Sequence, residues 1–185
     1  MKKLSGLLIV VLFAMLTVAA WGYANRPTSE PALPRVIHGF AFQPYQKDQD
    51  AIAGEDPTSA QIDADLKLLA GTTRAVRTYS SIGTLGEIPA LAHKHGLTVM
   101  LGSWIDSDRE RNDREVEAAI RLANTNRNVT RILIGNEVVL RGDLPVEDLI
   151  AHLDRVRAAT KQPVSTAEPW HVWIKHPELA RDVDF

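Results

Sequence analysis

The sequence lacks cysteine: none of its 185 residues carries a thiol. Disulfide bridges, thiolate nucleophiles and cysteine-bound metal ions are therefore excluded. The absence of cysteine does not indicate the cellular compartment, because many exported bacterial proteins have no disulfide bridges. An excess of basic residues is missing as well, since 21 Lys and Arg stand against 23 Asp and Glu and the formal net charge is -2. The chain has no basic footprint of the kind that binds nucleic acid, so we expect an uncharged or small ligand.

What the sequence does contain begins with an export signal. Lys2 and Lys3 precede an uncharged run over residues 4–24, with a dense apolar block at 7–20. The small residues of Gly22-Tyr23-Ala24 fit a signal-peptide cleavage point, while a run of about 20 residues equally suits a membrane anchor. We therefore expect residues 1–24 to be a signal peptide or a membrane anchor. Either alternative places the rest of the chain outside the cytoplasm, in the periplasm or the cell envelope.

Residues 25–34 contain three prolines among small and polar residues, and we interpret them as a linker. The remaining residues, 35–185, are numerous enough to bury the core of a soluble domain. Within them, short apolar runs rich in β-branched residues alternate with amphipathic segments. The predicted strands are residues 36–42, 75–79, 97–101, 131–135 and 164–167.

Each of these strands is followed by a pattern typical of a helix. The first predicted helix begins near residue 59 and the fourth near residue 145. The second is predicted to open with Thr84 and Glu87, which are spaced as a capping box, and the third with Asn112 and Glu115 in the same spacing. The pattern is a strict β-α alternation.

Such alternation predicts parallel strands, arranged either in an open doubly wound sheet or in a closed barrel. An open nucleotide-binding sheet needs a glycine-rich turn after its first strand, but residues 39–44 contain a single glycine followed by bulky side chains. We therefore predict an α/β fold, a (β/α)8 TIM barrel. The sequence supplies five strands, with residues 183–185 as the start of a sixth, whereas a complete barrel takes eight strands and about 250 residues. We expect residues 35–185 to be the N-terminal part of such a barrel.

In a β/α barrel the functional residues follow the carboxyl ends of the strands. At these positions the sequence places aromatic, amide and carboxylate side chains: Phe42, Tyr45, Tyr79, Ser80, Trp104, Asp106, Asn136, Glu137, Glu168, Trp170, His171 and Trp173. Aromatic rings pack on the apolar faces of sugars, and amides and carboxylates bind sugar hydroxyls, so the mixture suits a neutral carbohydrate. Any one tryptophan could instead be a packing residue, but three at one end of the barrel weigh against that interpretation.

Glu137 is the sharpest single feature. It follows the apolar residues 132–134 and emerges where that predicted strand leaves the core. We expect partial burial, which favours the protonated form that a general acid needs near neutral pH. Asn136 beside it can bond the sugar hydroxyl next to the reacting carbon. A glutamate without this context would be a solvated surface residue.

Four segments, taken in order, resemble glycoside hydrolase family 17: residues 39–45 (GFAFQPY), 77–79 (RTY), 134–138 (IGNEV) and 165–170 (STAEPW). The likeness is to the fungal and bacterial branch of that family, which holds β-1,3-glucanases, glucanosyltransferases and bacterial β-glucan synthesis proteins. It covers residues 36–185. The resemblance implies a retaining double displacement on a (β/α) barrel acting on β-1,3-glucan, with Glu137 as proton donor.

The resemblance also implies the supporting residues. Asn136 and Tyr79 match positions that hold the sugar and shape the site. Residues 168–173 match the subsite region after the fifth strand. The residues expected to bind substrate are Tyr45, Tyr79, Trp104, Asn136, Glu168 and Trp170. No metal and no cofactor is expected.

The second catalytic glutamate, the nucleophile, is expected after the seventh strand of the barrel, beyond the five to six strands of this sequence. Glu168 is not expected to replace it. It follows the strand next to that of Glu137 and would lie on the same side of the pocket, whereas a retaining mechanism needs the two carboxyl groups on opposite sides of the scissile bond.

Two hypotheses remain at this point. The first is a β-glucan hydrolase or transglycosylase that is incomplete in these 185 residues; hydrolysis and transfer share a glycosyl-enzyme intermediate, and the sequence does not choose between them. The second is a non-catalytic or degenerate β-glucan-binding barrel fragment, whose rim would bind sugar without cleaving it.

Overall fold

The computed structural model describes residues 2–28, 30, 32, 34–51 and 53–185. It divides into two compact units, residues 1–34 and 35–185. The first unit contains helix α1 (Lys2–Ala24), whose segment Gly6–Ala24 has a mean hydropathy of 2.3 and is long and apolar enough to cross a membrane. A signal sequence has the same properties, so both predicted alternatives fit. Three residues of the predicted linker, 29, 31 and 33, lie outside the described residues.

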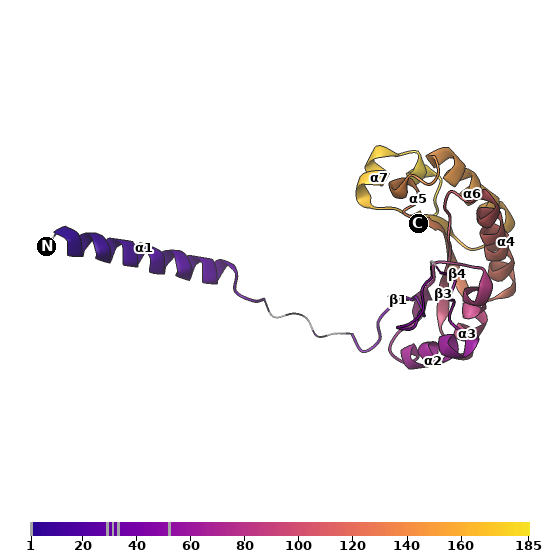
Figure 1. Ribbon diagram of the computed structural model, residues 1–185, viewed down its shortest axis with the longest axis horizontal. Coiled ribbons are helices and arrows are strands. Elements are labelled where there is room, and N and C mark those ends of the chain that lie inside the picture. The colour runs from indigo at the N-terminus through magenta and orange to yellow at the C-terminus, as the bar shows by residue number, and fades with distance from the viewer. Residues whose placement is uncertain (1, 29, 31, 33, 52) are drawn as a thin grey trace. The chain divides into compact units, whose positions relative to one another are not determined.

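Five parallel strands form one sheet in the second unit, in the sequential order β1-β2-β3-β4-β5 (Figure 1). They are β1 (Phe40–Ala41), β2 (Ala75–Arg77), β3 (Thr98–Ser103), β4 (Val129–Asn136) and β5 (Val164–Ala167). Neighbours pair in register, for example Val76 with Val99 and Leu101 with Ile132. A β/α barrel needs this unreversed order, whereas an open dinucleotide-binding sheet reverses its strand order. The predicted α/β fold is confirmed.

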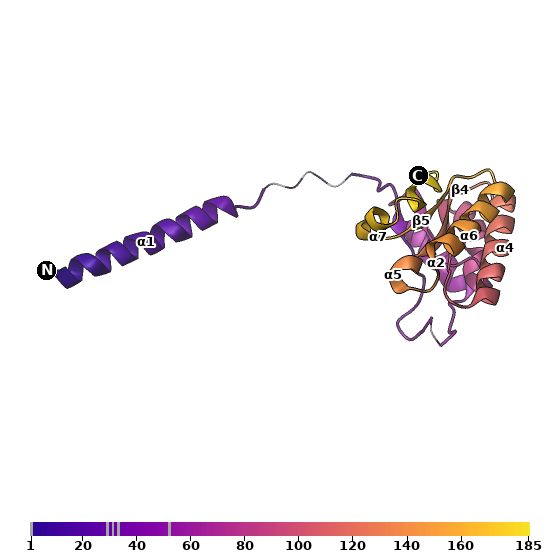
Figure 2. The same ribbon diagram turned by 90° about the horizontal axis from the view of Figure 1, so that it is seen from above.

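Four helices connect successive strands and pack along one side of the sheet (Figures 1 and 2). They are α2 (Ser59–Leu69), α3 (Ile88–Lys94), α4 (Arg109–Thr125) and α6 (Val146–Ala159). Shorter elements complete the connections: the 3-10 turns η1 (Gly83–Glu87) and η2 (Leu179–Arg181), and the helices α5 (Val138–Arg141) and α7 (Trp170–Lys175). Helices α5 and α7 follow the carboxyl ends of β4 and β5.

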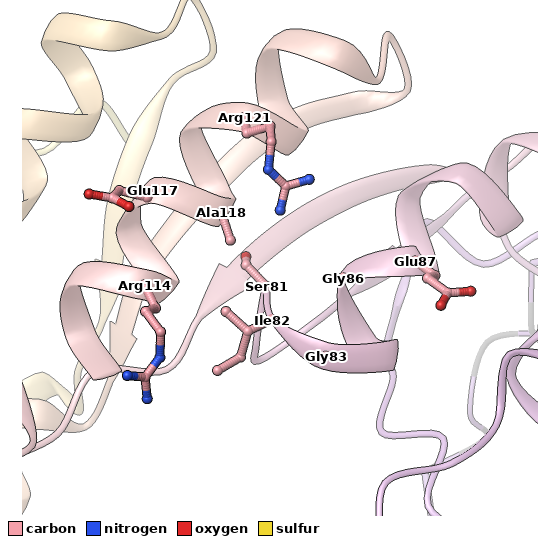
Figure 3. A pocket seen from close by; sticks show the side chains of 9 residues that line it. All are labelled: Ser81, Ile82, Gly83, Gly86, Glu87, Arg114, Glu117, Ala118 and Arg121. Atoms are coloured by element: carbon pink, nitrogen blue, oxygen red, sulfur yellow. The ribbon is translucent and has the colours of Figure 1, made fainter. Parts of the chain in front are cut away.

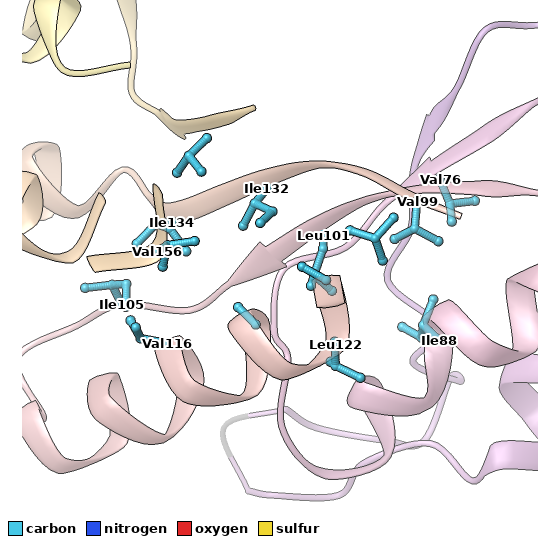
Figure 4. Packing of buried hydrophobic residues seen from close by; sticks show 14 of the residues in the cluster. Val76, Ile88, Val99, Leu101, Ile105, Val116, Leu122, Ile132, Ile134 and Val156 are labelled. Atoms are coloured by element: carbon cyan, nitrogen blue, oxygen red, sulfur yellow. The ribbon is translucent and has the colours of Figure 1, made fainter. Parts of the chain in front are cut away.

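The core lies between the sheet and these helices (Figure 4). Strands β2, β3 and β4 contribute Val76, Val99, Leu101, Ile132 and Ile134, and the helices contribute Ile88, Val116, Leu122 and Val156. Burying each such side chain contributes roughly 1.5–3 kcal/mol. The strand ends are thereby fixed relative to one another, which is what a multi-strand active site requires.

The capping box predicted at Thr84 and Glu87 is wrong. Residues 83–87 form the 3-10 turn η1, without a side-chain cap, and α3 begins only at Ile88. The turn packs closely, because a Cβ at Gly86 would lie 2.6 Å from the Ser81 carbonyl oxygen. Gly83 also adopts φ 60°, which lies outside the α-helical range, so no regular α-helical turn begins at these residues.

The capping box predicted at Asn112 and Glu115 is also wrong. Helix α4 begins three residues before Asn112, and its cap is Asp108, whose side chain accepts a hydrogen bond from the Arg111 N–H at 3.0 Å. Asn112 and Glu115 lie inside the helix and are fully buried. Asn112 bonds the main chain of Asp106, and Glu115 accepts hydrogen bonds from Ser80 and Ser81.

The predicted strand boundaries hold least well at the ends of the sheet. The first predicted strand, 36–42, is reduced to β1 and an isolated bridge between Ile37 and Thr73. Residues 183–185 form no regular strand, but Asp184 donates its N–H to the Val164 carbonyl at 2.9 Å and accepts from the Val164 N–H through its carboxylate at 2.8 Å. The C-terminal segment therefore follows β5, as expected for an approach to a sixth strand.

Candidate active site

The carboxyl ends of the five strands meet at one edge of the sheet, because all the strands are parallel. The chain leaves this edge through the loops after β1, β2 and β3 and through the short helices α5 and α7. We call this edge the active-site rim. It carries all the residues predicted to take part in function: Tyr45, Tyr79, Trp104, Asn136, Glu137, Glu168 and Trp170.

Strand β4 ends in a tight turn that carries Glu137. A Cβ at Gly135 (φ 82°) would lie 2.5 Å from a methyl carbon of Val138, so glycine is required there. Glu137 itself is left-handed, with φ 58° and ψ 31°, which costs roughly 1–2 kcal/mol for a residue with a side chain. Its N–H donates to the Ala167 carbonyl at 2.7 Å and its carbonyl accepts from the Arg141 N–H at 2.9 Å. Strained residues fixed in this way cluster at functional sites.

The side chain of Glu137 is exposed, so the predicted partial burial is wrong. The apolar run before it is buried as expected, with Ile132 and Ile134 fully inaccessible. The backbone then enters the left-handed turn, which directs the side chain of Glu137 out at the rim instead of along the strand. Its carboxylate is therefore open to a ligand at the rim.

Arg77 connects two of the predicted residues. Its guanidinium donates from Nη2 to the Asn136 side-chain oxygen at 2.8 Å and lies over the Tyr79 ring, 4.7 Å from the centroid. The amide of Asn136 is thereby held beside Glu137. Sequence reasoning did not identify Arg77 as a site residue. The available signal was its spacing, because residues two apart on a strand point to the same face, and Tyr79 was already predicted at the rim.

Arg141 makes a similar connection between Trp104 and the end of β4. Its guanidinium lies over the Trp104 ring, 4.5 Å from the centroid, and donates from Nη1 to the carbonyl of Asn136. The Trp104 indole N–H in turn donates to Asp106 at 3.1 Å, which holds the edge of the ring. Arg141 was also missed at the sequence level, where nothing distinguishes it from a solvated helix-terminal arginine.

A cavity of about 630 Å³ brings three of the predicted aromatic residues together, whereas Asn136 and Glu137 are not among the residues that line it. Tyr45, Tyr79 and Trp104 all line it. The Tyr45 hydroxyl donates to Asp56 at 2.9 Å, and burial together with this bond raises the pKa of Tyr45 to about 12. Tyr45 is therefore a neutral hydroxyl at physiological pH. A volume of this size, lined by aromatic and polar side chains, suits a short stretch of neutral sugar.

Glu168 and Trp170 do not line this cavity. The Glu168 carboxylate accepts from the N–H groups of Val139 at 2.9 Å and Leu140 at 3.3 Å, so it holds the first turn of α5 directly after Glu137. Trp170 is 74% exposed and meets His171 edge-to-face at 5.7 Å. Glu168 thus supports the turn that carries Glu137, and contact of either residue with substrate stays a prediction.

Glu115 is a buried carboxyl group near the rim that sequence reasoning did not place there. It is fully buried and accepts from the Ser80 hydroxyl and, at 2.7 Å, from the Ser81 N–H. These bonds tie the turn after Tyr79 to helix α4. Burial raises the pKa of Glu115 to about 7, against the opposing effect of the two serine bonds.

A second hollow, of about 560 Å³, lies between η1 and α4, away from Glu137 (Figure 3). Its lining includes two arginines, Arg114 and Arg121, and two glycines of η1. None of the residues predicted for substrate binding lines it. Within the described part of the chain, no group of three His, Asp or Glu side chains is arranged to hold a metal ion.

The geometry can be compared with known proteins. The family model of the BtgE/BtgC glycoside hydrolase domain matches residues 39–185. The chain belongs to this family. The β-1,3-glucanosyltransferase of Rhizomucor miehei, a member of glycoside hydrolase family 17, superposes with a TM-score of 0.65 at 25% identity, over 80% of this chain and 55% of that one. Its active-site mutant in complex with laminaritriose gives 0.66 over the same shares. The resemblance to glycoside hydrolase family 17 is confirmed.

Curated members show the same relation. A glucan 1,3-beta-glucosidase of Schizosaccharomyces pombe is 34% identical over 122 residues, which cover 60% of this chain and 38% of that protein. A probable glucan endo-1,3-beta-glucosidase of Aspergillus oryzae is 23% identical over 185 residues, which cover 88% of this chain and 27% of that protein. The aligned residues therefore span well under half the length of these two curated relatives.

Proposed function

We propose that this BtgE/BtgC chain forms the β4 side of the catalytic site of a retaining β-1,3-glucan hydrolase or transglycosylase. Glu137 is its general acid. The observation that carries the proposal is the end of β4, where a strained left-handed turn exposes Glu137 at the rim while Arg77 fixes the amide of Asn136 beside it. Named relatives support the substrate class, because they are glucan 1,3-beta-glucosidases and a glucanosyltransferase that was crystallised with laminaritriose.

In this mechanism Glu137 donates its proton to the glycosidic oxygen as the bond to the sugar breaks. A second carboxylate attacks the opposite side of the sugar ring and forms a glycosyl-enzyme. Glu137, now ionised, removes a proton from the incoming hydroxyl of water or of a second glucan. Asn136 bonds the hydroxyl next to the reacting carbon, and the rings of Tyr79 and Trp104 support neighbouring sugars.

Glu168 does not supply the second carboxylate in this proposal. Its carboxylate is occupied by the N–H groups of Val139 and Leu140, and hydrogen bonds of this kind weaken a nucleophile. The family resemblance implies a glutamate after the seventh strand of the barrel. Activity therefore has to be measured on the full-length protein that contains that strand.

The proposed location follows from α1. Its apolar segment Gly6–Ala24 supports export of the second unit, with α1 acting as a signal peptide or as a membrane anchor. An extracytoplasmic location fits a polymer substrate that is a cell-surface glucan. The N-terminal residue of the mature protein distinguishes a cleaved signal from a retained anchor.

The proposal is tested with the Glu137→Gln variant of the full-length protein. On unactivated β-1,3-glucan oligosaccharide we expect turnover to fall by about 10²–10⁴-fold, because general acid catalysis contributes that much. Binding of the oligosaccharide, measured by calorimetry, should change little. On a dinitrophenyl laminaribioside, whose weakly basic dinitrophenolate departs without protonation, the initial burst of dinitrophenolate should be largely retained.

The matched control is Glu147→Gln, which changes an exposed glutamate in the first turn of α6. It should leave turnover and binding unchanged. Unaltered turnover in Glu137→Gln would remove Glu137 from the acid role. Tight oligosaccharide binding without any turnover by the unmodified full-length protein would instead support the glucan-binding alternative.

A further inference from the structure

Arg141 is the last residue of α5, one helical turn after Glu137, and its side chain points back toward the ends of β3 and β4. The guanidinium donates to two main-chain carbonyls, from Nη1 to Asn136 and from Nη2 to Ile105 at 2.8 Å. Its Nε bonds the Asp143 carboxylate at 2.7 Å, and its flat face covers the Trp104 ring. Each nitrogen of this side chain has a partner, and the partners lie at the end of β4, in the loop after β3 and in the loop after α5.

The hydrogen bonds from Arg141 to the carbonyls of Asn136 and Ile105 connect two parts of the site, the turn that carries Glu137 and the loop that carries Trp104. The carbonyl of Asn136 belongs to the peptide group whose N–H is that of Glu137, and this N–H is bound to the Ala167 carbonyl. With Arg141 on the oxygen, the peptide before Glu137 is held at both ends. The bond to Ile105 anchors the same guanidinium to the loop that carries Trp104.

We propose that Arg141 is a positioning residue that locks the left-handed turn of Glu137 to the Trp104 ring, so that the general acid and the sugar-binding ring keep a fixed separation. This inference rests on the proposed function of Glu137 and adds a requirement to it. A bound glucan that stacks on Trp104 then presents its glycosidic oxygen to the acid at a set distance.

The chemistry of arginine explains why this residue type is required. The planar guanidinium offers donors in fixed directions and a flat cationic face, so it can bond two carbonyls while stacking on an indole. A lysine ammonium at the same place could reach one carbonyl but has no flat face. The ion pair with Asp143 links Arg141 only to a residue two positions along the chain, so it does not connect the Glu137 turn to Trp104.

The test compares Arg141→Met with Arg141→Lys and Asp143→Asn in the full-length protein. A displacement of about 1 Å in the reacting groups lowers turnover by about 10²-fold. We therefore expect Arg141→Met to lower kcat on unactivated β-1,3-glucan by about that factor and to raise KM only a few-fold. Arg141→Lys should retain part of the activity, and Asp143→Asn should retain nearly all of it. Arg155→Lys, in an exposed pair on α6, is the control for loss of an arginine.

Two further measurements separate positioning from a general structural effect. The burst of dinitrophenolate from the dinitrophenyl laminaribioside should be almost unaffected in Arg141→Met, because the departure of this leaving group needs no acid. In a Glu137→Gln background, Arg141→Met should add little further loss on unactivated glucan, since the acid that it positions is already gone. Tryptophan fluorescence of the free protein should change in Arg141→Met but not when Trp104→Phe is already present.

The outcomes are distinguishable from those for the proposed function. If Glu137→Gln stays active, the proposed function fails first. Suppose that Glu137→Gln behaves as expected. If Arg141→Met then lowers the turnover of both substrates by the same factor, or lowers the turnover of Glu137→Gln by its full factor, the positioning role is wrong while the acid role stands. Should Arg141→Met fail to fold, as seen by thermal unfolding, the same comparisons in Arg141→Lys decide the question.

Discussion

Two glutamates near the rim occupy opposite environments. Glu115 lies on α4 beneath the turn after β2, is fully inaccessible to solvent, and accepts hydrogen bonds from Ser80 and Ser81. Glu137 follows β4, is exposed, and sits on a backbone that is itself held by hydrogen bonds. At Glu115 the carboxyl group holds the loop after β2 in place. At Glu137 the hydrogen bonds of the backbone hold the carboxyl group in place. Under the proposed function this is a division of labour, in which a buried acid shapes the rim and an exposed acid meets the substrate.

The largest expected effect concerns the pH dependence of stability that Glu115 creates. Burial raises its pKa from 4.5 to about 7. Between these pH values the native state keeps a proton that the unfolded chain has lost, so the free energy of unfolding falls as pH rises through this window. At about 1.4 kcal/mol per pKa unit the loss is on the order of 3 kcal/mol. Urea unfolding from pH 4.5 to 8 should show this decline in the unmodified protein and a flatter profile in Glu115→Gln.

Parallel profiles for the two proteins would show that Glu115 does not retain its proton in the native state. The glutamine is a suitable replacement because its side-chain oxygen can still accept from the Ser81 N–H, while its amide can donate to the Ser80 hydroxyl oxygen. The difference between the two proteins therefore reports the charge and not the loss of the hydrogen bonds.

A smaller effect is expected from Glu115→Leu, measured at pH 5, where the native carboxyl is protonated. The substitution conserves much of the volume but leaves the buried Ser81 N–H without its acceptor, which costs about 1–3 kcal/mol. We expect a loss of about 2 kcal/mol in the free energy of unfolding by urea. The matching change in the other region, Glu137→Leu, should cost no more than about 0.5 kcal/mol because the side chain is exposed. Equal losses at the two positions would contradict the division of labour.

The same two residues mark where sequence reasoning succeeded and where it failed. The order of strands and the placement of Glu137 at the end of β4 follow from apolar runs alternating with amphipathic segments, which are local patterns. Glu115 was predicted to cap a helix because its spacing from Asn112 fits a capping box. Its actual partners, Ser80 and Ser81, lie 35 and 34 residues away. No local pattern encodes such a partner.

The prediction that Glu137 is partly buried failed for a related reason. An apolar strand predicts burial of its own residues but not the direction of the chain after it ends. That direction is set by the left-handed backbone at Glu137 and by the close contact between Gly135 and Val138, both of which depend on β5 and α5. Arg77 and Arg141 were missed because an arginine at a strand or helix end is usually solvated. Only the folded chain brings their acceptors within reach.

The smallest effect sharpens the comparison on the side of Glu137. If the turn stores strain for function, Glu137→Gly should raise the free energy of unfolding by about 0.5–1 kcal/mol, because glycine adopts a positive φ at no steric cost. Catalysis should be lost at the same time. The control is Glu110→Gly, which replaces an exposed glutamate in the first turn of α4, where glycine costs up to about 1 kcal/mol. Opposite signs of the change in stability for the two substitutions, measured by thermal unfolding, would show that the glutamate at position 137 destabilises its turn. This is expected for a residue that is retained for its carboxylate. A loss of stability in both would mean that the turn is relaxed and that its conformation says nothing about function.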